Sequence, residues 1–171
     1  MLIGTRICLG PVMAADAPHF FNWRNTLDLE RRNGVFRPLD EGAFGEWFAA
    51  LSKDPSRVMF ALRLNLDMRL IGYVGLSRIA PVERMAEVGI LIGQESDRNL
   101  GYGQEAMALI RDYAWSELNL QRLSLNVFSD NLNAIAAYQK SGFEIEGVQR
   151  RAVYVEGRFK DLVLMGLLRE P

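Results

Sequence analysis

The stretch Arg98–Gly103 contains two glycines, Gly101 and Gly103, between segments of different pattern. The preceding segment, Ala86–Gly93, is apolar and rich in branched residues, which predicts a mostly buried strand. The following segment, Ala106–Leu118, has apolar residues at helical spacing, which predicts an amphipathic helix. A strand, a glycine loop and a helix in this order form a candidate anion site, because the first N–H groups of a helix lack partners within it and its dipole favours negative charge there. A tight turn without a ligand explains the same two glycines equally well.

The loop lacks the signatures of two common phosphate-binding motifs. No Gly-Lys-Ser/Thr follows it, so it is not a Walker loop. A third glycine is missing at the spacing that the dinucleotide fingerprint requires. An anion bound here would therefore be held in a different way from the nucleotides of those two families.

Composition excludes several classes of protein. The length of 171 residues predicts one domain, 1–171, with a sizeable core. A net charge of −1 gives no electrostatic argument for nucleic acid or an anionic membrane, and no apolar run reaches the length of a membrane span. One cysteine, Cys8, and one histidine, His19, argue against a disulfide framework, a His-based metal site and a Ser-His triad. We expect a cytoplasmic protein with no metal, no nucleic-acid partner and no membrane partner.

The rest of the chain predicts a mixed sheet with helices on its faces. Meander strands come first, and a strand-helix-strand crossover follows. The segment 28–38 has no clean period, which predicts a loop or a broken helix. The expected strands cover 2–12, 57–64, 70–77, 86–93, 121–128, 143–148, 153–155 and 161–168, and the expected helices cover about 16–25, 41–51, 106–118 and 131–140.

Two motifs in this order resemble the GNAT N-acetyltransferases. They are the loop Arg98-x-x-Gly101-x-Gly103 and the run Asn131-x-x-Ala134-Ile135-x-x-Tyr138-x-Lys140-x-Gly142-Phe143. The ending from Glu146-Gly147 to Met165 resembles the branch with ribosomal-protein and spermidine acetyltransferases, and Trp23-Arg24-Asn25 with Trp47-Phe48 resembles acetyltransferases of nucleotide-linked amino sugars. The resemblance covers nearly the whole chain. It implies an α/β (α+β) fold with a twisted mixed, mainly antiparallel sheet flanked by helices on both faces, and acetyl-CoA as cofactor.

The resemblance also implies how the chain would bind CoA. The loop would cradle the pyrophosphate with backbone N–H groups, and the strand before it would pair with the pantetheine amides, because the neighbouring strand 121–128 splays away in this family. Asn131 would contact the CoA arm, although a helix cap is the ordinary use of such an Asn. Tyr138 would protonate the departing thiolate, the alternative being a core tyrosine packed under Phe143. The implied CoA residues are Ile90, Leu91, Ile92, Arg98, Asn99, Leu100, Gly101, Tyr102, Gly103, Asn131 and Tyr138.

The implied reaction is direct attack of an amine on the thioester, which requires the ammonium to lose a proton first. Glu87 is the candidate that orders a water to take this proton, the alternative being a surface or ion-paired carboxylate.

The acceptor is the less defined partner of this reaction. The resemblance places it against residues of the early helices, Trp23, Arg24, Asn25 and Arg37. Arginines suit phosphate or carboxylate groups, which favours a small-molecule amine such as a nucleotide-linked amino sugar. A polyamine, a protein N-terminus and a non-catalytic acyl-CoA-binding module are the alternatives. The C-terminal hairpin offers an edge on which a homodimer could form.

Overall fold

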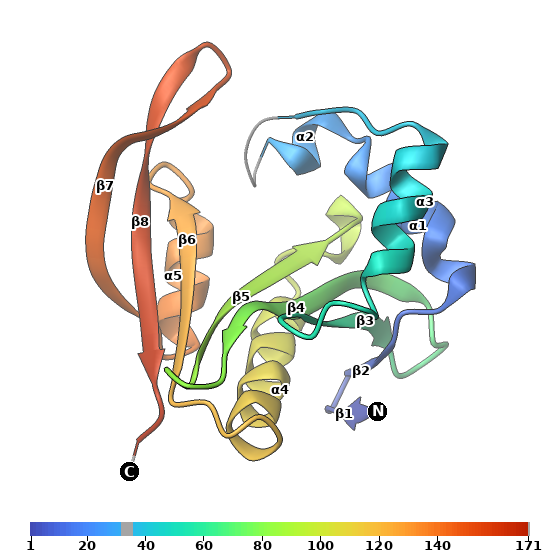
Figure 1. Ribbon diagram of the computed structural model, residues 1–171, viewed down its shortest axis with the longest axis horizontal. Coiled ribbons are helices and arrows are strands. Elements are labelled where there is room, and N and C mark those ends of the chain that lie inside the picture. The colour runs from blue at the N-terminus through green and yellow to red at the C-terminus, as the bar shows by residue number, and fades with distance from the viewer. Residues whose placement is uncertain (32–35, 171) are drawn as a thin grey trace.

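Eight strands form one sheet within residues 1–31 and 36–170, the part of the chain that the computed structural model describes (Figure 1). Their order is β1-β2-β3-β4-β5-β6-β8-β7, and all neighbours are antiparallel except β5 and β6. The strands are β1 (Leu2–Ile3), β2 (Ile7–Pro11), β3 (Val58–Leu64), β4 (Leu70–Ala80), β5 (Met85–Ile92), β6 (Arg122–Phe128), β7 (Glu144–Val155) and β8 (Arg158–Leu168). The predicted mixed, mainly antiparallel sheet is confirmed.

Helices of very different length connect these strands. The α-helices are α1 (Ala17–Arg24), α2 (Leu27–Glu30), α3 (Glu41–Ala50), α4 (Tyr102–Ser116) and α5 (Leu132–Lys140), and the 3-10 turns are η1 (Ala14–Asp16) and η2 (Glu95–Asp97). Within the predicted loop 28–38, the single turn α2 ends at Glu30, and residues 32–35 lie outside the described part of the chain. None of the helices in the described ranges is long and apolar enough to cross a membrane.

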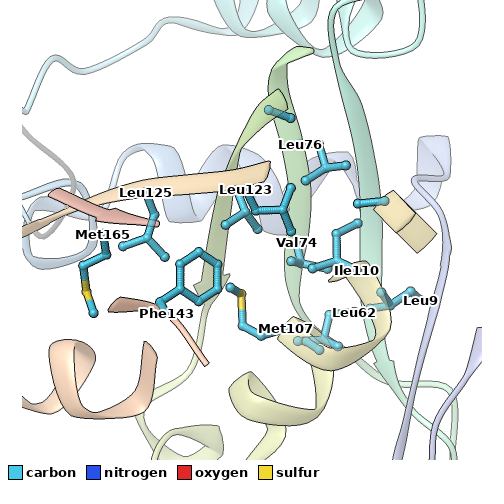
Figure 2. Packing of buried hydrophobic residues seen from close by; sticks show 14 of the residues in the cluster. Leu9, Leu62, Val74, Leu76, Met107, Ile110, Leu123, Leu125, Phe143 and Met165 are labelled. Atoms are coloured by element: carbon cyan, nitrogen blue, oxygen red, sulfur yellow. The ribbon is translucent and has the colours of Figure 1, made fainter. Parts of the chain in front are cut away.

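The two faces of the sheet carry separate hydrophobic cores, because successive residues of a strand point to opposite sides. On one face, Val74 of β4 packs in the same cluster as Ile110 of α4, as Figure 2 shows. On the other face, Leu91 of β5 packs in a second cluster with Phe20 of α1 and Phe44 of α3. The predicted flanking of the sheet by helices on both faces is therefore confirmed.

The first predicted strand is wrong as a single element. The segment 2–12 forms two short antiparallel strands, β1 and β2, joined by a turn in which the N–H of Gly4 donates to the carbonyl of Ile7 at 2.9 Å. The carboxylate of Glu105 in α4 accepts the N–H of Arg6 at 2.8 Å and caps this turn from outside. A Cβ on Gly4 would lie 2.5 Å from Glu105 Oε1, so the glycine permits the approach. Local alternation cannot reveal a partner so far along the chain.

Strands β5 and β6 form a fork. Their parallel pairing is confined to Met85–Glu87 against Arg122–Ser124. Beyond that point β6 continues to pair with β8 as far as Phe128, while β5 continues to pair with β4. Figure 1 shows the two strands diverging. Within the described residues, the facing edges of β5 and β6 therefore have no strand partner beyond Glu87 and Ser124, as expected for a strand that splays away from its neighbour.

Strand β7 is the outer edge of the sheet on the C-terminal side. It is exposed over most of its length, including the apolar side chains of Ile145, Val148 and Tyr154. The turn to β8 is tight, with positive φ at Glu156 and Gly157. This edge is the one on which the sequence places a homodimer, and that association stays a prediction.

Candidate active site

A cavity of about 860 Å³ lies at the fork between β5 and β6. Residues from β5, from the loop before α4, from β6 and from α5 line it. Leu100 and Tyr102 of the predicted CoA residues are not part of this lining. The predicted residues that do line it are Ile90, Leu91, Ile92, Arg98, Asn99, Gly101, Gly103, Asn131 and Tyr138. The structure thus brings together strand, loop and helix residues that are up to 48 positions apart in the sequence.

The loop before α4 presents backbone N–H groups at one end of the cavity. Gly101 is the N-cap of α4 with φ of +84°, and Asn99 is also left-handed with φ of +59°. The N–H of Glu105 is the first to bond back, to the Gly101 carbonyl at 3.2 Å, so the preceding N–H groups of the first turn have no helical partner. A Cβ on Gly103 would meet only the Ile90 side chain, at 3.9 Å. This open helix N-terminus can accept an anionic group such as a pyrophosphate.

Two arginines hold the loop in place. Arg98 donates to the carbonyls of Ile92 at 3.2 Å and Gly93 at 3.0 Å, so its side chain ties the loop to the end of β5. Arg6 donates to the carbonyl of Leu100 at 2.7 Å and also pairs with Glu105 at 3.1 Å. Arg6 and Glu105 escaped the sequence analysis, because their partners are almost a hundred residues away.

The pKa of the Glu105 carboxyl reflects this anchoring role. Burial raises the pKa, but hydrogen bonds from the backbone and side chain of Arg6, and from the backbone of Ile7, outweigh burial and hold it below the ordinary value of 4.5. The carboxylate therefore stays charged while it joins the start of β2 to the first turn of α4.

Asn131 and Tyr138 sit on α5 at the cavity wall. The Asn131 side chain accepts the N–H of Ala134 at 3.3 Å, so it is the helix cap, and its contact with CoA stays a prediction. The Tyr138 ring packs edge-on against Phe143, with 6.1 Å between ring centroids. Burial raises the pKa of the Tyr138 phenol above its ordinary value of 10. The phenol is therefore protonated at neutral pH and lines the cavity, as a proton donor must.

Glu87 lies at the point of the fork but outside the cavity lining. It is the last β5 residue paired with β6, opposite Ser124. Its carboxylate accepts from Arg78 Nη1 at 2.5 Å. Arg78 occupies an irregularity in the pairing of β4 with β5 and is left-handed, with φ of +51°. The ion-paired state is the alternative that the sequence left open, and the role of Glu87 as base stays a prediction.

Most of the predicted acceptor residues have structural contacts away from the cavity. Trp23 is buried, and a Cβ on Gly93 would collide with its indole ring. Arg24 pairs with Glu30 at 3.2 Å and lies over the ring of Trp47, 5.3 Å from its centroid.

The other two predicted acceptor residues differ from each other in their surroundings. The Asn25 side chain bonds the backbone N–H of Leu39 at 2.9 Å and its carbonyl at 3.1 Å, which fixes the approach to α3. Arg37 is exposed.

A second, smaller cavity of about 350 Å³ adjoins the first, and they share Leu29, Glu95 and Arg98. Trp23 lines it together with Asp28. Arg24, Asn25 and Arg37 are not among the residues described as lining either cavity. The structure therefore brings one of the four predicted acceptor residues to a cavity.

The ion pair of Arg24 and Glu30 joins α1 to α2, and Glu30 is buried. Burial raises the pKa of Glu30 above 4.5, and the charge of Arg24 opposes this only in part. Burial and the negative charge of Glu30 raise the pKa of Tyr73 to about 12. Among the described residues, Arg24 Nε has no hydrogen-bond partner. These groups hold α1 and α2 together rather than reaching the fork.

Two residues to which the sequence analysis assigned no role, Asn126 and Lys140, also line the main cavity. Asn126 lies on β6 beyond the last pairing with β5, and Lys140 is in the last turn of α5. The alternation on β6 could have identified Asn126, because Leu125 and Val127 are buried and the residue between them must face the other side. Lys140 is exposed and places a positive charge at the cavity wall.

The chain is similar in sequence to N-acetyltransferases. The chain is 34% identical over 110 residues to the uncharacterized N-acetyltransferase YoaA of Bacillus subtilis, which is 64% of this chain and 62% of the relative. It is 35% identical over 102 residues to the spermidine N(1)-acetyltransferase of Escherichia coli K12, which is 60% of this chain and 54% of the relative. The chain thus spans between half and two thirds of the length of these two relatives.

A solved structure extends the likeness to the whole fold. The spermidine N-acetyltransferase of Vibrio cholerae, in complex with CoA and spermine, superposes with a TM-score of 0.89 over 96% of both chains at 23% sequence identity. Residues 6–144 match the acetyltransferase (GNAT) domain family, which is most of the chain and includes the fork, the loop and both helices of the site. The protein therefore belongs to the GNAT family of acetyltransferases.

Proposed function

We propose that this protein transfers the acetyl group of acetyl-CoA directly to a primary amine of a small molecule. The observation that carries the proposal is the fork, where a free edge of β5 borders a cavity with an open helix N-terminus at one end. The amides of a pantetheine arm can pair with such an edge as an added strand does. The pyrophosphate would then meet the N–H groups of the loop, and Lys140 would add a positive charge near the phosphates.

The proposed chemistry uses the residues around the fork. The amine attacks the thioester carbon, and a backbone N–H on the free edge of β5 stabilises the oxygen as it becomes negative. The carbon–sulfur bond then breaks, and Tyr138 donates its proton to the departing thiolate, whose conjugate thiol has a pKa near ~8.5. Glu87 takes a proton from the acceptor ammonium through a water before the attack. The nitrogen loses its second proton to solvent as the amide forms, Glu87 releases its proton to solvent, and Tyr138 regains a proton from solvent.

We infer that the acceptor is a small cationic amine such as a polyamine. Arg24, one of the two predicted acceptor arginines, pairs with Glu30 at 3.2 Å, and Glu30 is buried. This carboxylate already neutralises the guanidinium that would hold the phosphate of a nucleotide-linked amino sugar. The spermidine acetyltransferases among the relatives support the same class of acceptor.

The test is release of CoA from acetyl-CoA in the presence of a panel of amines, with product masses recorded. The panel contains spermidine, spermine, putrescine, a nucleotide-linked amino sugar, and peptides that begin with Ala or Ser. We expect turnover with the polyamines, much reduced in Tyr138→Phe. Tyr154→Phe is the matched control, because Tyr154 is an exposed tyrosine on β7 that packs with Phe159.

Two results would contradict the proposal in different ways. Turnover with the amino sugar or the peptides alone would keep the reaction and replace the acceptor class. Tight binding of acetyl-CoA without release of CoA in the presence of any amine would favour the non-catalytic acyl-CoA-binding module.

A further inference from the structure

Gly89, in the middle of β5, has no structural reason to be glycine. Its φ is not among the positive values of this chain, so the backbone does not require glycine there. A Cβ on Gly89 would meet no atom within 4 Å, so close packing does not require it either. Other glycines of the same sheet differ, since a Cβ on Gly72 would collide with the carbonyl of Leu91 and one on Gly75 would lie 2.6 Å from the carbonyl of Val58.

A glycine inside a strand is unfavourable, because it gains nothing from packing and loses more backbone freedom than other residues. Such a residue often marks a place where a ligand or another backbone comes close. In the part of the chain that the structure describes, no backbone comes close to the space over Gly89. Gly89 is exposed, so this space is open to solvent and to an incoming ligand.

The position of Gly89 in the sheet indicates which ligand would approach it. It lies two residues beyond Glu87, the last β5 residue that pairs with β6, and therefore on the free edge. Val88 packs in the core under α4, whereas Leu91 packs in the core under α1 and α3. By alternation, position 89 faces the same side as Glu87 and Leu91, away from α4. Gly89 lines neither described cavity, and its missing side chain leaves the surface of the strand open on this face, beside the fork.

Building on the acetyl transfer proposed above, we propose that Gly89 determines acceptor specificity by keeping open the path along which the amine reaches the thioester. The pantetheine arm would pair with the strand edge, in the plane of the sheet, whereas a side chain at position 89 would stand perpendicular to that plane. A larger residue would therefore obstruct the acceptor and leave the CoA arm in place.

The surroundings of Gly89 indicate the chemical class of the acceptor. Glu87 lies two residues away along the same face, about 7 Å between the Cα atoms. Its carboxylate is 31% exposed and pairs with Arg78 at 2.5 Å. A protonated amine that approaches over Gly89 would compete with Arg78 for this carboxylate. A strand position without a side chain next to a carboxylate suits a primary amine on an unbranched chain.

The experiment compares Gly89→Ala and Gly89→Val with the wild-type enzyme. Both substitutions replace glycine by a better strand former, so the melting temperature is expected to be unchanged or higher, which separates obstruction from unfolding. Gly45→Ala in α3 is the matched control, because a Cβ there also meets no atom within 4 Å. Three quantities are measured: calorimetric binding of CoA, slow hydrolysis of acetyl-CoA by water, and kcat/KM for spermidine.

We expect Gly89→Val to lower kcat/KM for spermidine about tenfold or more, and Gly89→Ala to lower it less, because the effect follows the volume added to the path. CoA binding and hydrolysis are expected to be unchanged, since the arm lies elsewhere and water is small. Unchanged kcat/KM for spermidine in Gly89→Val would overturn the inference and leave the proposed function intact. Equal fold losses in the affinity for CoA and in kcat/KM for spermidine would also overturn the inference. A wild-type enzyme that binds CoA and acetylates no amine would overturn both proposals.

Discussion

Replacing Gly101 by alanine should lower both the stability of the fold and the affinity for CoA. Gly101 has φ of +84°, a conformation that costs an alanine about 1–2 kcal/mol. The new Cβ would also lie 3.0 Å from Arg6 Nη2. Arg6 must then shift, which weakens its hydrogen bond to the Leu100 carbonyl, a bond worth on the order of 1 kcal/mol. We therefore expect a loss of about 2–3 kcal/mol in the free energy of unfolding, or roughly 4–12 °C in melting temperature.

The expected loss of affinity for CoA follows from the same shift of Arg6, which holds the loop. If the loop shifts so that one charge-assisted hydrogen bond to the pyrophosphate is lost, affinity falls by about 1.5–3 kcal/mol, which raises the Kd for CoA about tenfold to a hundredfold. Denaturant unfolding gives the first quantity, and isothermal titration with CoA gives the second. Gly101→Asn should lose less of both, because asparagine tolerates the left-handed conformation better than alanine.

Gly157→Ala provides the matched control for backbone strain. Gly157 has φ of +75° in the turn between β7 and β8, and a Cβ there meets no atom within 4 Å. We expect it to lose about 1–2 kcal/mol of stability and to bind CoA as the wild type does. If Gly101→Ala also bound CoA like the wild type despite its lower stability, the loop would not be the pyrophosphate site.

Three further predictions concern protons. Tyr138→Phe should lower kcat about a hundredfold or more while the Kd for CoA stays unchanged. Because burial raises the pKa of Tyr138, wild-type activity should decline from loss of this proton only above the ordinary tyrosine range, and a decline assigned to Tyr138 near pH 8 would refute the assignment. Glu105→Gln should destabilise the fold at pH 7. The folded protein holds the pKa of Glu105 below the ordinary value of 4.5, so the carboxylate stabilises the fold above pH 4.5, and this stabilisation is lost as the pH falls through the lowered pKa. If the difference in stability between Glu105→Gln and the wild type grew on acidification, this prediction would be contradicted. Glu87→Gln should lower kcat/KM at neutral pH and recover above the pKa of the amine, ~10.4 for an alkyl ammonium, whereas an equal loss at all pH values would remove Glu87 as the base.

The sequence was most informative where chemistry depends on near neighbours. The glycines predicted a loop that opens a helix, although α4 begins at Tyr102, directly after Gly101, and not at the expected Ala106. An asparagine before an apolar period predicted the cap of α5 at Asn131. Alternation and spacing also located most strands and the longer helices. Each of these features is decided by backbone preferences and capping within a few residues, which local sequence carries.

The fork was expected from family resemblance and not from residue chemistry, because no local pattern says where two strands stop pairing. The split of the first strand into β1 and β2 depends on Glu105, 99 residues away from Arg6. The pairing of Arg24 with Glu30 likewise changed the interpretation of the acceptor side, since the charge of an arginine says nothing about whether a carboxylate already occupies it.

By itself, the sequence determined the glycine loop before a helix and the cap of α5, since each follows from preferences within a few residues, and the order of the elements indicated a mixed sheet. Only the tertiary structure decided that the loop, the free edge of β5 and Tyr138 surround one cavity, and that the surface over Gly89 is open. These relations depend on which strands pair and where the pairing ends. Strand pairing is settled by the packing of segments far apart in the chain, and spacing along the chain does not record it.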